Sequence, residues 1–121
     1  MEKAKVLFVD DELITLKSFE LYFKNDFDVV TARDGSTAMT LLEENKDMAV
    51  LITDYKMPQI SGLQLIKQAK SIHPKLICVL VTGYTDTPEI LEAKSDKILA
   101  ETFTKPIDLQ YLEEKIYAML T

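Results

Sequence analysis

The chain has 121 residues, of which 47% are hydrophobic and 28% are charged, and its net charge at pH 7 is −6. This length favours one domain, residues 1–121, with a single core, and the composition is ordinary for a globular protein. The negative charge argues against nucleic acid as a direct ligand, because phosphate backbones recruit basic surfaces. No apolar run approaches the roughly 20 residues of a membrane span, so we expect no membrane partner.

Five apolar runs predict strands, and several of them are continuously rich in Val, Ile and Leu. That pattern is typical of a parallel sheet covered on both faces. The predicted strands are residues 6–9, 27–31, 48–53, 76–82 and 102–104. The gaps between them show helical spacing, as in Leu16, Phe19 and Phe23 after the first strand.

Two helix starts carry specific capping signals. Residues 61–64 read Ser-Gly-Leu-Gln, which has the form of a capping box. Residues 87–89 read Thr-Pro-Glu and predict a cap and first turn for a helix near residues 90–94. Leu109, Leu112 and Ile116 form the stripe of a last helix. The alternation predicts an α/β fold, a three-layer doubly wound (βα)5 sandwich with five parallel strands.

The single cysteine, Cys78, lies in an apolar run and cannot form an internal disulfide. The charged start, residues 1–5, leads into a predicted strand and does not resemble a signal peptide. Such a chain fits a reducing compartment. We therefore expect a cytoplasmic protein in which Cys78 is a small core residue.

Carboxylates follow two of the predicted strands. Asp54 ends the third strand, and Asp10 and Asp11 directly follow the first. Open α/β sheets build their sites at this edge. Neighbouring carboxylates repel one another and raise each other's pKa values, which a divalent cation relieves. Oxygen ligands without Cys or His select Mg²⁺ or Mn²⁺.

A structural reading of the same acids stays open. An acidic pair after a strand is also what a helix N-cap or a solvated loop end uses. Asp54 is harder to explain in this way, because a carboxylate at the end of a buried strand needs a partner.

A lysine and a threonine follow the other two strands of the predicted pocket. Lys105, before Pro106, can pair with Asp54 or with a phosphoryl oxygen, and the proline permits a cis peptide bond. Thr82 can donate to the same group, and Gly83 lets the chain approach it closely. His73, which precedes Pro74, is predicted to be an exposed loop residue without a role.

These side chains together predict a phosphoryl-transfer site. Asp54 is the expected nucleophile and would form an aspartyl phosphate. Mg²⁺ and Lys105 would neutralise the phosphoryl oxygens, and Thr82 would bind one of them.

From Lys5 to Leu120 the chain resembles a receiver domain of a two-component response regulator, of the kind found in chemotaxis regulators. The matching pieces are residues 9–12 (Val-Asp-Asp-Glu), residues 54–58 (Asp-Tyr-Lys-Met-Pro) with Ser61 and Gly62, residues 81–84 (Val-Thr-Gly-Tyr), and Lys105 with Pro106. Each piece is weak alone, but their order and spacing are specific. The resemblance implies the flavodoxin-like strand order 2-1-3-4-5.

The resemblance also implies roles for single residues. Asp54 matches the phosphoacceptor, Asp10 and Asp11 match the acids that hold Mg²⁺, and the backbone carbonyl of Lys56 matches a further metal ligand. Thr82 matches the switch hydroxyl. Such a domain catalyses only its own phosphorylation and dephosphorylation, and is in that sense not an enzyme with a separate substrate.

The partner implied by the resemblance is a histidine kinase or a histidine phosphotransfer protein, which donates the group from a phosphohistidine. Phosphorylation would shift the face made by the fourth helix, the fifth strand and the last helix, including Tyr111 and the surroundings of Lys94. The resemblance leaves room for an output domain or an effector protein, and for a homodimer on phosphorylation.

The chain departs from the family pattern near the fifth strand. Members often carry Tyr or Phe three residues before the lysine, where Thr102 stands here and Phe103 follows. Either the aromatic half of the switch is absent, or the register of this strand is shifted. Lys56 and Tyr84 occupy positions that tune phosphoryl lifetime in the family.

Three other functions compete with this prediction. A flavin-binding domain of the same fold needs a phosphate-binding loop after the first strand, where Asp10 and Asp11 would repel a phosphate. A pseudo-receiver would use the fold for docking without phosphorylation, for which the altered Thr102 leaves room. A phosphatase with an aspartyl nucleophile usually has a second Asp where Lys56 stands.

Overall fold

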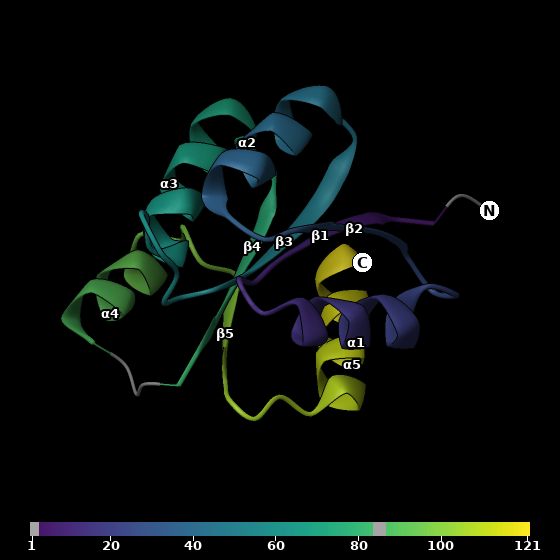
Figure 1. Cartoon of the computed structure of the whole chain (residues 1–121). Coiled ribbons are helices and arrows are strands. Elements are labelled where there is room, and N and C mark those ends of the chain that lie inside the picture. The colour runs from purple at the N-terminus through teal and green to yellow at the C-terminus, as the bar shows by residue number, and fades with distance from the viewer. Residues whose placement is uncertain (1–2, 84–86) are drawn as a thin grey trace.

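The protein folds as a three-layer α/β sandwich around a five-stranded parallel sheet (Figure 1). The computed structural model describes residues 3–83 and 87–121. The strands are β1 (Lys5–Val9), β2 (Asp28–Ala32), β3 (Met48–Asp54), β4 (Ile77–Thr82) and β5 (Glu101–Thr104). The helices are α1 (Leu13–Phe23), α2 (Gly35–Glu44), α3 (Gly62–Ile72), α4 (Pro88–Ser95) and α5 (Leu109–Leu120).

The strand order is β2-β1-β3-β4-β5, with every pair parallel. This confirms both the doubly wound fold and the order that the family resemblance implies. The predicted strands and helices are all present, with ends that differ by one or two residues from the sequence prediction. The second strand begins at Asp28 rather than at Phe27, because Phe27 packs in the core just before the ladder starts.

The two faces of the sheet carry different cores. Helices α1 and α5 cover one face, and α2, α3 and α4 cover the other (Figure 1). All five phenylalanines of the chain lie in the α1–α5 core, where Phe8 stacks on Phe19 with ring centroids 4.5 Å apart. The opposite core is built mainly of Leu, Ile and Ala side chains and contains the buried Cys78. Cys78 is therefore the small core residue that the sequence predicts.

Helix caps form where the sequence signals them. Ser61 and Gln64 make a full capping box at the start of α3, and the Thr87 hydroxyl accepts a hydrogen bond from the Ile90 backbone at the start of α4. Each cap satisfies backbone N–H groups that the helix leaves unpaired and contributes about 1 kcal/mol. The caps fix where α3 and α4 begin, at the edge of the sheet where β3 and β4 end.

His73 differs from its prediction. It is half-buried at the end of α3, and its Nε2 lies 2.8 Å from the backbone oxygen of Leu42 in α2. The predicted loop position is confirmed, since α3 ends at Ile72, but the predicted exposure was wrong, because the imidazole joins two neighbouring helices that only the tertiary structure brings together. The role of His73 is therefore structural.

No helix among residues 3–83 and 87–121 combines the length and the apolar character that crossing a membrane requires.

Candidate functional site

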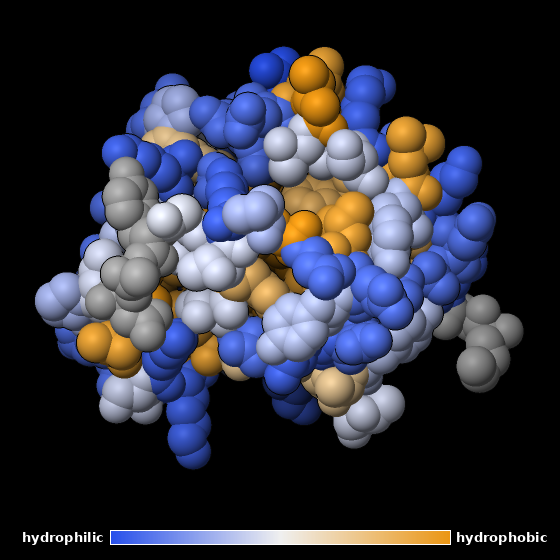
Figure 2. Space-filling view, turned by 90° about the horizontal axis from the view of Figure 1, so that it is seen from below, coloured by the Kyte–Doolittle hydropathy of each residue, from blue (hydrophilic) through white to orange (hydrophobic). Residues whose placement is uncertain are grey.

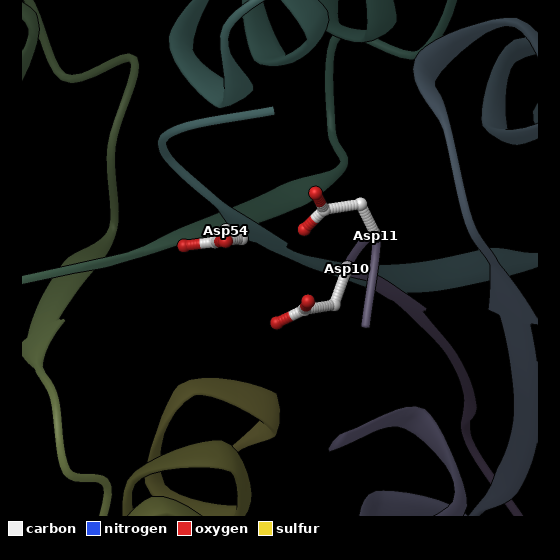
Figure 3. Close-up of side chains that lie close together, drawn as sticks. All are labelled: Asp10, Asp11 and Asp54. Carbon is white, nitrogen blue, oxygen red and sulfur yellow. The ribbon is translucent and has the colours of Figure 1, made fainter. Parts of the chain in front are cut away.

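Three carboxylates meet at the carboxyl ends of β1 and β3 (Figure 3). Asp10 and Asp11 follow β1, and Asp54 is the last residue of β3. One oxygen of each lies within 4.8 Å of the others. They converge because β1 and β3 are direct neighbours in register, so parallel strands deliver their ends to the same place.

Asp10 is held by the start of α1. Its Oδ1 accepts a hydrogen bond from the Glu12 backbone N–H at 2.8 Å, and its side chain is buried. The pKa of Asp10 is raised to about 6, mainly by burial. The hydrogen bond from Glu12 and the charge of Lys105 lower this pKa, whereas the charges of Asp54 and Asp11 raise it further. Asp10 therefore helps to order the start of α1, which agrees with the alternative that the acidic pair serves a helix start. It also lies close to the two other acids, Asp11 and Asp54.

Lys105 provides the positive charge of the site. Its Nζ lies 3.0 Å from Oδ1 of Asp54, whose side chain is only 8% exposed. Partial burial lowers the pKa of Lys105, but the hydrogen bond and the charge of Asp54 outweigh this effect, and the net pKa is raised. Lys105 therefore stays charged at neutral pH and supplies the partner that the buried Asp54 requires.

The backbone brings Lys105 and Thr82 together. The Lys105 N–H donates to the Thr82 carbonyl at 3.0 Å, which continues the pairing of β4 with β5 beyond Thr104. The peptide bond between Lys105 and Pro106 is cis, the form that the proline permits. The buried Thr82 thereby lies at the same edge as Asp54.

Two cavities open on Asp54, and Glu12 and Lys105 line both of them. The first has about 500 Å³ and a polar lining, which consists of Asp11, Glu12, Asp54, Lys56, Thr82, Gly83 and Lys105. Every residue predicted for the site except Asp10 lines this cavity. The second has about 530 Å³ and lies between α1 and the start of α5, where Ile14, Phe19, Ile107 and Leu109 contribute apolar walls. Figure 2 views this edge of the molecule and shows apolar surface gathered in a recess.

The sequence indicated Gly62 as part of a capping box and of the family pattern, but not the reason for a glycine. A Cβ atom at Gly62 would collide with the backbone oxygen of Asp54. The missing side chain lets the first turn of α3 approach the end of β3 closely, and the Gly62 N–H donates to the Tyr55 carbonyl at 2.7 Å. The spacing of Gly62 after Asp54 is the signal that points to this contact. Glu12 belongs to the matched run of residues 9–12, but no role was predicted for it. Ile14 was not predicted, and no local pattern distinguishes it from ordinary surface residues.

Strand β5, where Thr102 departs from the family pattern, pairs with β4 in a regular register. Thr102 pairs with Leu80 and Phe103 pairs with Val81, so neighbouring side chains of β5 point to opposite faces of the sheet, and Phe103 is the one that belongs to a core. Phe103 packs in the α1–α5 core against Tyr111, with ring centroids 5.6 Å apart. Of the two alternatives, a shifted strand is thus excluded, and the position three residues before Lys105 holds a threonine. Tyr84 lies outside the described residues.

The donor set fits a hard divalent cation. Three clustered carboxylate oxygens, without histidine or cysteine, suit Mg²⁺, which commonly takes one or two carboxylates and keeps several waters. Burial is the main cause of the raised pKa of Asp10, and the charges of Asp54 and Asp11 add to it; a cation would relieve the repulsion among these acids. The acids at this edge can therefore bind a metal ion.

The profile of the response regulator receiver domain matches residues 6–117, nearly the whole chain. The chain is also 34% identical to a chemotaxis protein CheY homolog of Campylobacter jejuni over 95 residues, covering 77% of this chain and 72% of that protein. The chain therefore belongs to the response regulator receiver domain family. A two-component signalling partner follows from this membership in general terms.

Solved structures agree with the fold. The receiver domain protein from Clostridium thermocellum superposes with a TM-score of 0.87 at 30% identity, over 95% of this chain and 92% of that chain. The chain is 33% identical to a cyclic di-GMP phosphodiesterase of Thermotoga maritima over 92% of its own length, but it spans only 29% of that relative. It likewise spans less than a quarter of two hydrogenase transcriptional regulatory proteins, 22% and 23%. Homologous receiver domains thus occur both in proteins of similar length and within much longer ones.

Proposed function

We propose that the chain accepts a phosphoryl group on Asp54 from the phosphohistidine of a histidine kinase or a histidine phosphotransfer protein. The observation that carries this proposal is the setting of Asp54, a nearly buried carboxylate at a strand end, 3.0 Å from Lys105 and grouped with two further acids. A carboxylate that is already ionised needs no general base to act as a nucleophile.

In the proposed reaction, a carboxylate oxygen of Asp54 attacks the phosphorus of the donor. An oxygen–phosphorus bond forms as the bond between phosphorus and the donor imidazole breaks, and the bond's electron pair leaves with the imidazole. Asp10, Asp11, Asp54 and the backbone carbonyl of Lys56 would hold Mg²⁺, which neutralises phosphoryl oxygens when it is bound. Lys105 lies where its ammonium can contact another phosphoryl oxygen, and Thr82 would bind a third. Water later hydrolyses the aspartyl phosphate and restores Asp54.

The proposed output is a change in the face formed by α4, β5 and α5. Phosphorylation would attract the Thr82 hydroxyl and displace the chain that leads from β4 to α4. Tyr111, which is about half exposed on α5, belongs to this face. The effector is an output domain or a separate protein, or the face pairs with a second copy of the chain.

The Thr102 position supports one second candidate. With a regular strand register, the chain lacks the aromatic residue that members of the family often use to couple the switch hydroxyl to the output face. A pseudo-receiver that docks without phosphorylation would not need this coupling. The intact group of acids and Lys105 favours the phosphoacceptor.

The test is incubation with Mg²⁺ and acetyl phosphate, followed by intact mass spectrometry. We expect one added phosphoryl group on the wild type and none on Asp54→Asn, which keeps the shape of the side chain but removes its charge. Labelling of Asp54→Asn would contradict the assignment of the acceptor. No labelling of a wild type that binds Mg²⁺ would support the pseudo-receiver.

A further inference from the structure

One hydrogen bond joins the loop after Asp54 to α4. The Tyr55 hydroxyl donates to Oε2 of Glu89 at 3.2 Å, across 34 residues of sequence. Tyr55 directly follows the proposed phosphoacceptor and directly precedes Lys56, and Glu89 lies in the first turn of α4. The bond therefore connects the edge of the site to the helix that the proposed output face includes.

The main chain of Tyr55 is fixed on both sides. Its N–H donates to the Val81 carbonyl in β4 at 2.8 Å, and its carbonyl accepts from the first residue of α3, Gly62, at 2.7 Å. Both bonds are short and hold the peptide units on either side of Tyr55 in one place. The ring is half-buried against the aliphatic core, so its hydroxyl is held near the first turn of α4, where the exposed Glu89 side chain meets it.

Helix α4 is a short element with two buried anchors. It has eight residues, and only Ile90 and Ala93 are buried against the sheet. A helix with so few core contacts can change position at a low cost in free energy. The bond from Tyr55 to Glu89 adds a polar contact at its first turn, where a shift that starts at the end of β4 would arrive first.

We propose that Tyr55 is a positioning residue, and that its hydrogen bond to Glu89 couples the position of α4 to the loop that contributes to the metal site. This coupling provides a route from the site to α4 that does not use a ring at Thr102. Linkage makes it reciprocal: if the position of α4 favours Mg²⁺ binding, Mg²⁺ binding favours the same position of α4. The inference rests on the proposed function for the identity of the cation and for the backbone carbonyl of Lys56 as one of its ligands.

A double-mutant cycle on the full chain tests the coupling. The variants are Tyr55→Phe, which removes only the hydroxyl, Glu89→Ala, and both together. We expect each single variant to weaken Mg²⁺ binding about threefold, and the double variant to be no weaker than either, because all three lose the same bond. Glu92→Ala is the matched control: the residue is exposed in the same helix and loses the same charge. It should change the affinity by less than about 1.5-fold.

A second readout separates coupling from a general loss of stability. Amide chemical shifts of Leu91 and Glu92 should respond to saturating Mg²⁺ in the wild type, and this response should shrink by at least about half in Tyr55→Phe. Unchanged affinity in both single variants, or effects that simply multiply in the double variant, would overturn the inference while leaving the proposed function intact. A wild type that does not bind Mg²⁺ would overturn both.

Discussion

The carboxylate half of the site (Asp10, Asp11 and Asp54) stands at the ends of β1 and β3, two strands that have neighbours on both sides. The lysine half (Thr82 and Lys105) stands at the ends of β4 and of β5, a four-residue strand at the edge of the sheet. Central strands, among them β4, are positioned by two ladders and two layers of helices, whereas the edge strand β5 has one ladder. Side-chain packing therefore has to hold β5, and with it Lys105, in place.

The largest effect on stability is expected at Phe103, whose packing holds the edge strand β5. Phe103 is 6% exposed, and Phe103→Ala should lower the free energy of unfolding by about 3–5 kcal/mol through the lost burial and the cavity left beside Tyr111. Thr102→Ala, on the opposite face of the same strand and only partly buried, is the control and should cost less than about 1.5 kcal/mol. Urea unfolding measures both. Equal costs would show that Phe103 is not the anchor of β5.

A metal ligand in the carboxylate half should give the next largest effect. Asp11→Ala should weaken Mg²⁺ binding at least tenfold, or about 1.4 kcal/mol, because it removes a carboxylate from the cluster. Asp28→Ala removes the same charge at the start of β2, at the opposite edge of the sheet, and should have little effect. Calorimetric titration gives both affinities. If Asp11→Ala binds Mg²⁺ like the wild type, Asp11 is not a ligand.

Asp10→Asn should stabilise the metal-free protein. The amide oxygen can still accept the Glu12 N–H, and the cost of a buried charge disappears. A carboxyl whose folded pKa is raised from 3.8 to about 6 binds more protons in the native state, so native stability falls as pH rises from about 4 to 6. Allowing for solvent screening, the variant should be more stable by about 1–2 kcal/mol at pH 7 and lose this gain below about pH 4.

The measurement for Asp10→Asn is urea unfolding at several pH values without divalent cations. Saturating Mg²⁺ provides the internal control, since it stabilises only a protein that binds it and should favour the wild type. A variant that is less stable than the wild type at pH 7 without metal would show that the charge of Asp10 is compensated in the native state.

The smallest effect on metal binding is expected in the lysine half. Lys105→Ala should change Mg²⁺ affinity by less than about threefold, since the ammonium contacts one oxygen of Asp54 and is 37% exposed. The same variant should lose the shift of α4 amide signals that follows phosphorylation of the wild type. Lys115→Ala, a lysine on α5 that contacts Glu101, is the control for removing a charge. An unchanged phosphorylation-dependent shift in Lys105→Ala would remove Lys105 from the switch.

Much of the site could be predicted from short sequence patterns. An apolar run followed by an acid places Asp54 at a strand end, and alternation of strands and helices makes the sheet parallel, so Asp10, Asp11 and Lys105 reach the same edge. These predictions succeed because the periodicity of a parallel sheet is local and its geometry leaves few arrangements.

Other features depend on contacts between distant segments. The sequence left two readings for Thr102, and the pairing of Val81 with Phe103 decided between them. His73 was predicted to be exposed but meets the Leu42 carbonyl of a neighbouring helix. The second, apolar cavity and its walls at Ile14 and Ile107 arise only where α1 and the start of α5 approach each other.

The fold class, the family and the residues of the acidic site follow from the sequence alone, because strand ends, turns and caps are encoded over a few neighbouring residues. The distance from Lys105 to Asp54, the raised pKa of Asp10 and the bond from Tyr55 to Glu89 follow only from the folded arrangement. Each of these depends on burial or on a contact between separate elements, and packing of the whole chain sets both.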